Sequence, residues 1–185
     1  NIKQHAMLHK IPKGEIESRM EYAADILGLD EYMDRKVDSL SGGWKRKTSI
    51  VCAIVHRPEL LLLDEPTAGL DTRSRHLLWD LNRRGTTIFL TTHYIEEAES
   101  LCDRVAIINH GRLVAVGTVD ELRDTIGRVS VEYQRDGRME VRHFPTRDEA
   151  KRYSETLGDS YFNIRRTTLE DVFLELTGED RGKLA

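Results

Sequence analysis

The chain has 185 residues, of which 28 are basic and 32 acidic, giving a net charge of -4. That length allows one large core or two smaller ones. No run of like charge suggests a nucleic-acid arm, so the charge balance disfavours a nucleic-acid partner. The longest apolar stretches have the length of a strand and fall far short of the ~20 residues that cross a bilayer. We therefore expect one or two domains and no membrane-spanning segment.

The first part of the chain predicts helices. Apolar side chains recur at helical spacing across residues 16–27, and Gly28 ends the pattern. A second helix is expected over residues 43–56, because Pro58 cannot continue it. The chain begins at Asn1 without an initiator methionine, and its first residues resemble the middle of a helix. We expect it to be a piece of a longer protein.

A leucine-rich strand follows the helices. Residues 60–63 are four consecutive leucines, a pattern typical of a strand that is buried on both faces of a parallel sheet. Helices and strands then alternate, as they do in layered α/β folds. The helices are expected over residues 73–82 and 95–101, and the strands over residues 86–90, 105–108 and 113–116.

The pattern changes near Gly127, where apolar and polar residues begin to alternate. Asp136 and Gly137 form a strong hairpin signal between two such strands. A helix, a third strand and a final helix carrying Leu169 and Val172 complete a ββαβα unit. We expect a small second domain over residues 127–185 that ends in a frayed tail.

Two adjacent carboxylates end the leucine strand. Asp64 and Glu65 therefore lie at the carboxyl edge of the predicted sheet, where open α/β folds bind ligands. Mg²⁺ prefers oxygen ligands and keeps several waters, so Asp64 together with phosphate oxygens is enough to hold it. Glu65 is placed to polarise a water for in-line attack. A surface carboxylate pair at a strand end is the alternative interpretation.

Residues 40–43 (Leu-Ser-Gly-Gly) precede the second helix. The backbone N–H groups of Gly42 and Gly43, the Ser41 hydroxyl and the positive helix end could together receive a terminal phosphate. The same residues are also a common way to start a helix, with Ser41 as its cap. Either interpretation accounts for this segment on its own.

His93 and Asp71 are the other candidates. His93 lies just past the strand over residues 86–90, so it shares the sheet edge of Asp64 and Glu65, where it can hold a phosphate and the attacking water. A lone histidine after a strand is more often structural. Asp71 lies on a tight turn after the carboxylates, and capping the next helix would also explain it.

In this order, four motifs resemble the nucleotide-binding subunit of an ATP-binding cassette (ABC) transporter. They are Leu-Ser-Gly-Gly at residues 40–43, Leu-Leu-Leu-Leu-Asp-Glu-Pro at 60–66, Ala-Gly-Leu-Asp at 68–71 and Thr-Thr-His-Tyr at 91–94. Residues 168–178 resemble the C-terminal extension of the export branch that handles drugs, polysaccharides or lipids. The resemblance covers nearly the whole chain.

The resemblance implies a fold and a division into domains. The fold is the C-terminal half of an α/β P-loop NTPase, with a small α+β domain after it. The ABC ATPase domain would cover residues 1–126, with a helical subdomain over residues 1–56 and the catalytic sheet over residues 57–126.

The resemblance also implies roles at two nucleotides. Asp64 would act on Mg²⁺, Glu65 would be the catalytic glutamate and His93 the switch histidine. Residues 41–43 would contact the γ-phosphate of ATP held by a second nucleotide-binding subunit in a head-to-tail dimer, and Asp71 would communicate across that interface. Closure on ATP would drive export through a transmembrane permease subunit, with this subunit peripheral to the cytoplasmic face of the membrane.

Three departures from the family pattern stand out. The phosphate loop, Gly-x-x-x-x-Gly-Lys-Ser/Thr, does not occur in the chain, so we expect the chain alone not to hydrolyse ATP. Trp44 replaces the glutamine that usually follows the signature glycines, and residues 71–85 are about one helical turn shorter than usual.

Two alternative functions remain: a soluble ABC ATPase acting on nucleic acid or ribosomes, and a non-catalytic regulatory cassette.

Overall fold

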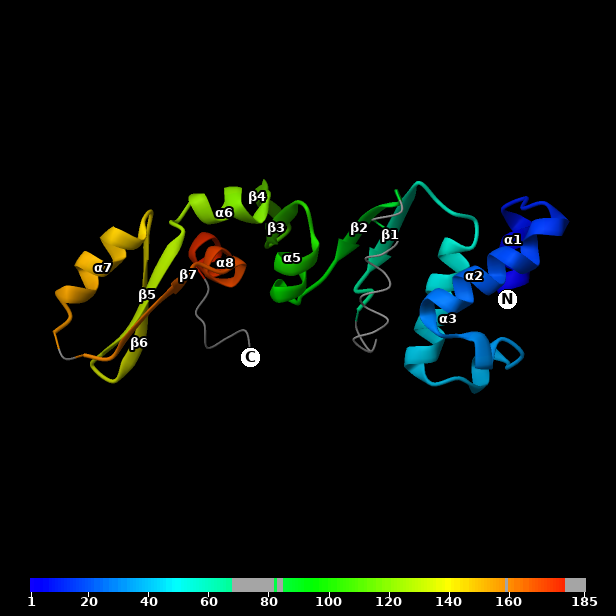
Figure 1. Cartoon of the computed structure of the whole chain (residues 1–185), viewed down its shortest axis with the longest axis horizontal. Helices are drawn as coiled ribbons and strands as arrows, with labels where there is room; N and C mark the ends of the chain where they lie inside the picture. The colour runs from blue at the N-terminus through cyan, green and yellow to red at the C-terminus, as the bar shows by residue number, and fades with distance from the viewer. Residues whose placement is uncertain (68–81, 83–84, 159, 179–185) are drawn as a thin grey trace. The chain divides into compact units, whose positions relative to one another are not determined.

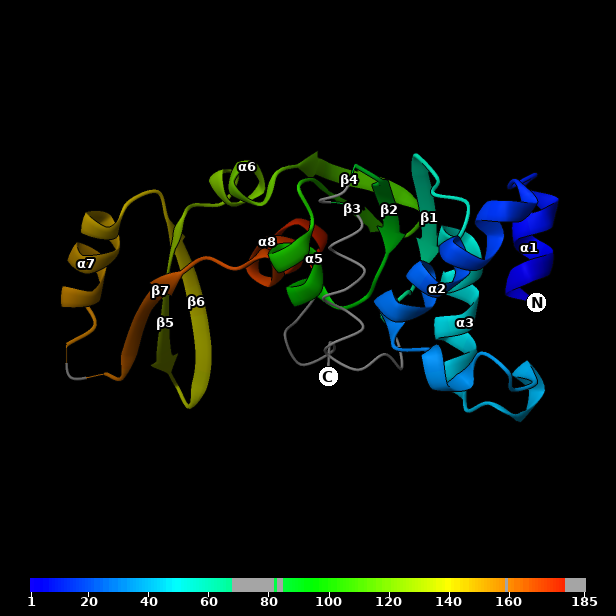
Figure 2. The same ribbon diagram turned by 45° about the vertical axis from the view of Figure 1, so that its right-hand side comes forward.

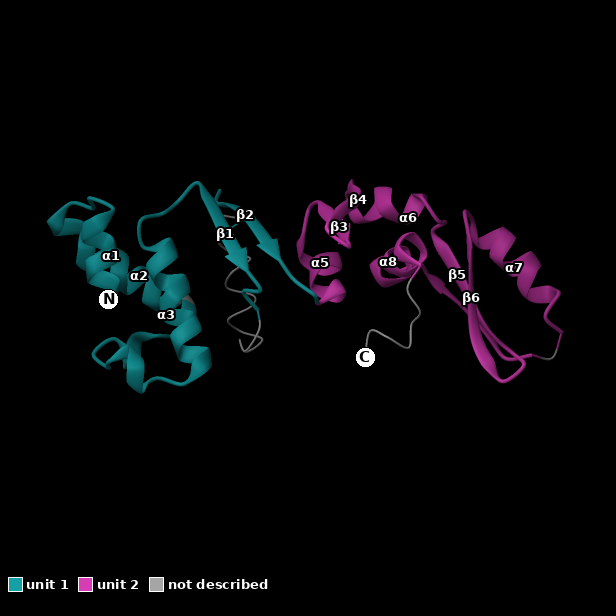
Figure 3. Cartoon of the chain, turned by 180° about the vertical axis from the view of Figure 1, so that it is seen from behind, with its two compact units in different colours: residues 1–93 teal, residues 94–185 magenta. Residues whose placement is uncertain are grey.

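The computed structural model describes residues 1–67, 82, 85–158 and 160–178. The chain divides into two compact units, Asn1–His93 and Tyr94–Ala185 (Figure 3). The domain boundary predicted near Gly127 lies inside the second unit and stays a prediction. The predicted frayed tail and nearly all of the helix predicted over residues 73–82 lie outside the described residues.

The first unit begins with a helical part (Figure 1). Its described helices are α1 (Ile2–Leu8), η1 (Lys13–Glu15), α2 (Ile16–Leu27), η2 (Asp30–Tyr32), η3 (Val37–Ser39) and α3 (Gly42–Ile54). The predicted helix over residues 16–27 is confirmed, and Gly28 ends it in a left-handed conformation with φ 63° that favours glycine. Apolar residues of α2 and α3 form one core: Ile16, Ala23, Ala24, Leu27, Ile50, Val51 and Ile54.

Two parallel strands follow α3. They are β1 (Leu60–Asp64) and β2 (Thr87–Thr91), and their register pairs Leu60 with Thr87 and Asp64 with Thr91. Leu61 is buried in the helical core, and Leu63 and Ile88 pack against it. Parallel strands put their carboxyl ends at one edge, so the register aligns the residues that follow both strands.

Burial of β1 on both faces was the wrong expectation. Leu60 is 56% exposed, Leu62 70% and Phe89 62%, whereas Leu61 on the opposite face is only 5% exposed. The reason is that α3 and its core cover one face of the strand pair, and no described element of this unit covers the other. A run of leucines indicates an apolar strand, but it does not show which face is covered.

The second unit contains a helix-covered hairpin. Its elements are α5 (Ile95–Leu101), β3 (Val105–Asn109), β4 (Arg112–Gly117), α6 (Val119–Asp124) and, much later in the chain, α8 (Leu169–Thr177). The predicted turn between β3 and β4 is confirmed, with His110 at φ 47° and Gly111 at φ 72°. The predicted capping box of Thr118 and Glu121 at the start of α6 is also present.

A three-stranded antiparallel sheet completes this unit. Its strands β5 (Val129–Arg135), β6 (Arg138–Phe144) and β7 (Phe162–Arg166) lie in the order β6-β5-β7, and α7 (Arg147–Glu155) packs alongside the sheet (Figure 2). The observed order of elements is the predicted ββαβα. However, α8 buries Leu169 and Val172 together with Ile107 of β3 and Leu122 of α6. Residues after Gly127 therefore share a core with residues before it.

Candidate functional site

The carboxyl ends of β1 and β2 bring three predicted residues together. Asp64 is the last residue of β1 and pairs with Thr91, the last residue of β2. Glu65 follows Asp64 directly, and His93 lies two residues past Thr91. The structure thus places two carboxylates and an imidazole at one sheet edge, as the alternation of strands predicted.

Glu65 and His93 are in direct contact. His93 Nδ1 lies 2.8 Å from Glu65 Oε2. The His93 side chain is 63% exposed and that of Glu65 34%. Oε2 itself is buried and has no hydrogen-bond partner among the described atoms. A half-buried carboxylate beside an exposed imidazole is an arrangement that can hold and polarise a water.

Thr91 fixes both carboxylate residues. Its hydroxyl donates to Asp64 Oδ1 at 2.5 Å, and the Glu65 N–H donates to the Thr91 carbonyl oxygen at 3.1 Å. The Thr91 hydroxyl oxygen also lies 3.2 Å from the Glu65 nitrogen. Sequence reasoning did not single out Thr91 as a site residue. Only the register of β1 and β2, which pairs Thr91 with Asp64, shows its role.

The backbone of Glu65 is strained. Its φ is 46°, in the left-handed region that residues other than glycine rarely adopt, and it precedes Pro66, which disfavours helical conformations for the residue before it. Such a conformation costs about 1–3 kcal/mol and persists only when neighbouring groups hold it. The strain therefore shows that Glu65 is held in place by its surroundings.

Arg46 helps to keep Glu65 in this conformation. This half-buried side chain of α3 donates from Nη2 to the backbone carbonyl oxygen of Asp64 at 2.6 Å, and also to that of Glu65. Arg46 is not among the site residues predicted from the sequence. Nothing in the spacing of the sequence shows that an arginine on α3 reaches the end of β1.

The signature residues begin α3. Ser41 occupies the N-cap position, but its side chain makes no capping hydrogen bond. Ser41 and Gly42 are exposed, and the first N–H groups of a helix have no partner within it. The helix start is therefore open to an anion, and the capping explanation of Ser41 loses its support.

Trp44 lies in the first turn of α3 and packs within the first unit. Its ring stacks on Tyr32 with centroids 4.0 Å apart, and Lys47 Nζ lies 4.4 Å from the Trp44 ring centre. Cation–π contacts of this kind stabilise by about 0.5–2 kcal/mol. The tryptophan that replaces the usual glutamine is thus engaged with its own unit. Asp71, the remaining candidate, lies outside the described residues.

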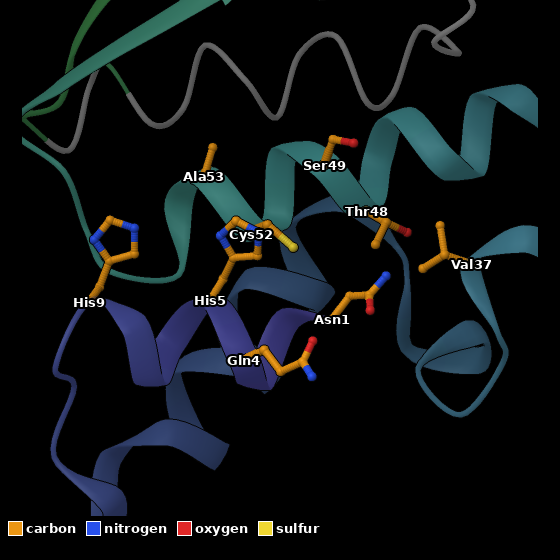
Figure 4. Close-up of a pocket in the computed structure, with 9 residues that line it drawn as sticks. All are labelled: Asn1, Gln4, His5, His9, Val37, Thr48, Ser49, Cys52 and Ala53. Carbon is orange, nitrogen blue, oxygen red and sulfur yellow. The ribbon is translucent and has the colours of Figure 1, made fainter.

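A separate pocket lies between α1 and α3, with a volume of about 560 Å³ (Figure 4). His5 of α1 and His9, which directly follows α1, extend toward α3, where Cys52 lines the opposite wall. The ring of His9 stacks on His56, with centroids 3.8 Å apart. Burial, together with the neighbouring His9 and His5, lowers the pKa of His56. The pocket contains none of the residues predicted to act on ATP.

Comparisons with known proteins identify the family of this chain. The ABC transporter family model matches residues 1–68. The daunorubicin/doxorubicin resistance ATP-binding protein DrrA of Streptomyces peucetius is 47% identical over 58% of this chain and 34% of its own length. The Nod factor export ATP-binding protein I of Cupriavidus metallidurans is 34% identical over 97% of this chain and 67% of its own.

A solved structure agrees as well. The ATP-binding subunit of an ABC transporter superposes with a TM-score of 0.65 at 25% identity, over 95% of this chain and 61% of its own. The chain belongs to the ATP-binding subunits of the ABC transporter family. The predicted family and the α/β P-loop NTPase fold class are confirmed, and this family binds ATP. The chain spans about one to two thirds of the length of the relatives it matches.

Proposed function

We propose that this chain carries the hydrolytic and signature parts of an ATPase subunit that energises export through a membrane permease. The contact of Glu65 with His93 beside Asp64, at 2.8 Å, is the observation that carries the proposal. The names of the relatives support the direction of transport, since they are resistance and export ATP-binding proteins. The phosphate loop would come from residues outside this chain.

The carboxylate edge fits Mg²⁺. Asp64 is exposed and uses Oδ1 to accept from Thr91. Its second oxygen would be the one to accept from a metal-bound water. Among the described residues, no group of three His, Cys, Asp or Glu side chains could hold a metal ion by itself. Mg²⁺ prefers oxygen ligands and keeps several waters, so one carboxylate and phosphate oxygens would be enough to hold it. When bound, Mg²⁺ would neutralise charge on the phosphates.

The protein residues would then do three things. Glu65 would accept a hydrogen bond from the attacking water, and His93 would hold that water and the terminal phosphate. Residues 41–43 would contact the γ-phosphate held by a second subunit, since the start of α3 offers exposed N–H groups. Asp71 would communicate across the same interface.

The partners follow from this arrangement. We propose a transmembrane permease subunit and a second nucleotide-binding subunit in a head-to-tail dimer, at the cytoplasmic face of the membrane. None of the helices in the part of the chain that the structure describes combines the length and apolar character needed to cross a bilayer.

Replacing His93 by Asn in the complete subunit with its permease should lower ATP turnover about 100-fold, because the loss of one positioned hydrogen-bonding group at a reacting centre costs about that much. The measurement is steady-state phosphate release. His110→Asn is the matched control, since His110 is exposed on a hairpin turn at φ 47°, a conformation that Asn tolerates. Equal turnover for both variants would contradict the role of His93.

A further inference from the structure

Arg46 joins two parts of the molecule that the proposed function assigns to different nucleotides. It lies on α3, five residues after Ser41, and its guanidinium reaches the backbone of Asp64 and Glu65. The start of α3 would contact the partner subunit's ATP. Asp64 and Glu65 would act on the ATP of their own subunit.

Arg46 contacts the backbone at a strained residue, Glu65. Glu65 has φ 46° before Pro66 and is fixed from two sides. From β2, Thr91 accepts the Glu65 N–H at 3.1 Å, and from α3, Arg46 donates to the Glu65 carbonyl oxygen. Hydrogen bonds from a charged donor are about twice as strong as neutral ones. Arg46 is therefore a principal support of the strained residue.

Ser41 and Arg46 belong to one continuous helix, because Ser41 is the N-cap of α3 and Arg46 lies in its second turn. The later turns of the same helix bury Ile50, Val51 and Ile54 in the core of the first unit. A helix that is packed in this way moves as a body, since close-packed interiors do not deform continuously. A displacement of Ser41 by a bound phosphate would thus move Arg46, and Arg46 would move the Glu65 backbone.

We infer that Arg46 is a positioning residue that couples the two ATP sites of the dimer, by linking the signature helix to the backbone of Glu65. This inference rests on the proposed function. Occupation of the partner's nucleotide by Ser41 would align Glu65 for attack on the nucleotide of its own subunit. Hydrolysis would then require both sites to be closed.

The test compares Arg46→Met, Arg46→Lys and Lys45→Met in the complete subunit with its permease. Lys45 is the exposed neighbour on the same helix and controls for loss of charge. Arg46→Met should lower kcat about tenfold or more, as expected for loss of charge-assisted hydrogen bonds, with KM for ATP within about threefold. Arg46→Lys, which can reach one carbonyl, should be intermediate at an unchanged Tm. Lys45→Met should keep kcat within about twofold.

Coupling is tested by a double-mutant cycle with Ser41→Ala. If Arg46 transmits occupation of Ser41, Arg46→Met should have little further effect on kcat in the Ser41→Ala background. Fully additive losses would overturn the inference. A wild-type kcat in Arg46→Met, or an equal loss of kcat in Lys45→Met, would also overturn it. If Arg46→Met fails to fold, a wild-type kcat in Arg46→Lys would overturn it instead. An inactive wild-type subunit would instead refute the proposed function.

Discussion

Glu65→Gln should abolish most ATP turnover while leaving ATP binding intact. The amide keeps the size of the side chain but cannot accept a proton or carry the negative charge that polarises the attacking water. We expect kcat to fall about 100- to 10,000-fold. Because closure would be stabilised by unhydrolysed ATP, the variant should also accumulate a dimer. Phosphate release and size-exclusion chromatography with ATP and Mg²⁺ measure the two effects.

Glu59→Gln provides the matched control for this result. Glu59 is exposed and lies just before the first residue of β1, at the end of the strand opposite Glu65. It should keep wild-type turnover and form no trapped dimer. A Glu65→Gln variant that turns over ATP normally would favour the regulatory-cassette alternative over a catalytic subunit.

Arg165→Met should destabilise the second unit by about 3–5 kcal/mol, because it leaves a buried charge without its partner. Arg165 Nη1 lies 2.6 Å from Asp171 Oδ2, and Nη2 donates to Asp171 Oδ1 at 2.9 Å and to Glu132 Oε1 at 2.8 Å. The Asp171 side chain is fully buried. Chemical denaturation measures the loss. The exposed Arg138→Met, on β6 of the same sheet, should change stability by less than about 0.5 kcal/mol.

The same cluster predicts a pH dependence. Burial alone would raise the pKa of Asp171, but hydrogen bonds from Arg165 and Thr168 outweigh it and hold that pKa well below its usual value. The ionised carboxylate therefore stabilises the fold above the unfolded-state pKa of about 3.9, and this contribution is lost as the pH falls below that value. The difference in stability between wild type and Arg165→Met should shrink below about pH 4. A difference that stays constant down to pH 2 would contradict this account.

Local sequence signals predicted most elements of the fold. Residues 16–27 combine helical spacing with a terminal glycine, and the turns at Gly111 and Gly137 need positive φ, so short-range chemistry decides them. The exposed faces of Leu60 and Leu62 could not be predicted, because coverage of a strand depends on segments that a local pattern does not contain. The packing of α8 against β3 and α6 also depends on contacts across long sequence distances.

The candidate site was predictable to a similar extent. Asp64, Glu65 and His93 each follow an apolar strand, and parallel pairing brought them to one edge. Thr91 and Arg46 were not predictable, since their roles depend on the register of β2 and on the position of α3 beside β1. The left-handed conformation of Glu65 before Pro66 is likewise a property of the assembled site.

The central claim is that this chain contributes to two nucleotides, through its sheet edge to one and through its signature helix to the other. The most direct measurement is a structure of the complete Glu65→Gln subunit, with its permease, trapped with ATP and Mg²⁺. The account predicts that each γ-phosphate lies between Asp64 and His93 of one subunit and residues 41–43 of its partner. A γ-phosphate contacted by the sheet edge and the signature residues of a single subunit would contradict it.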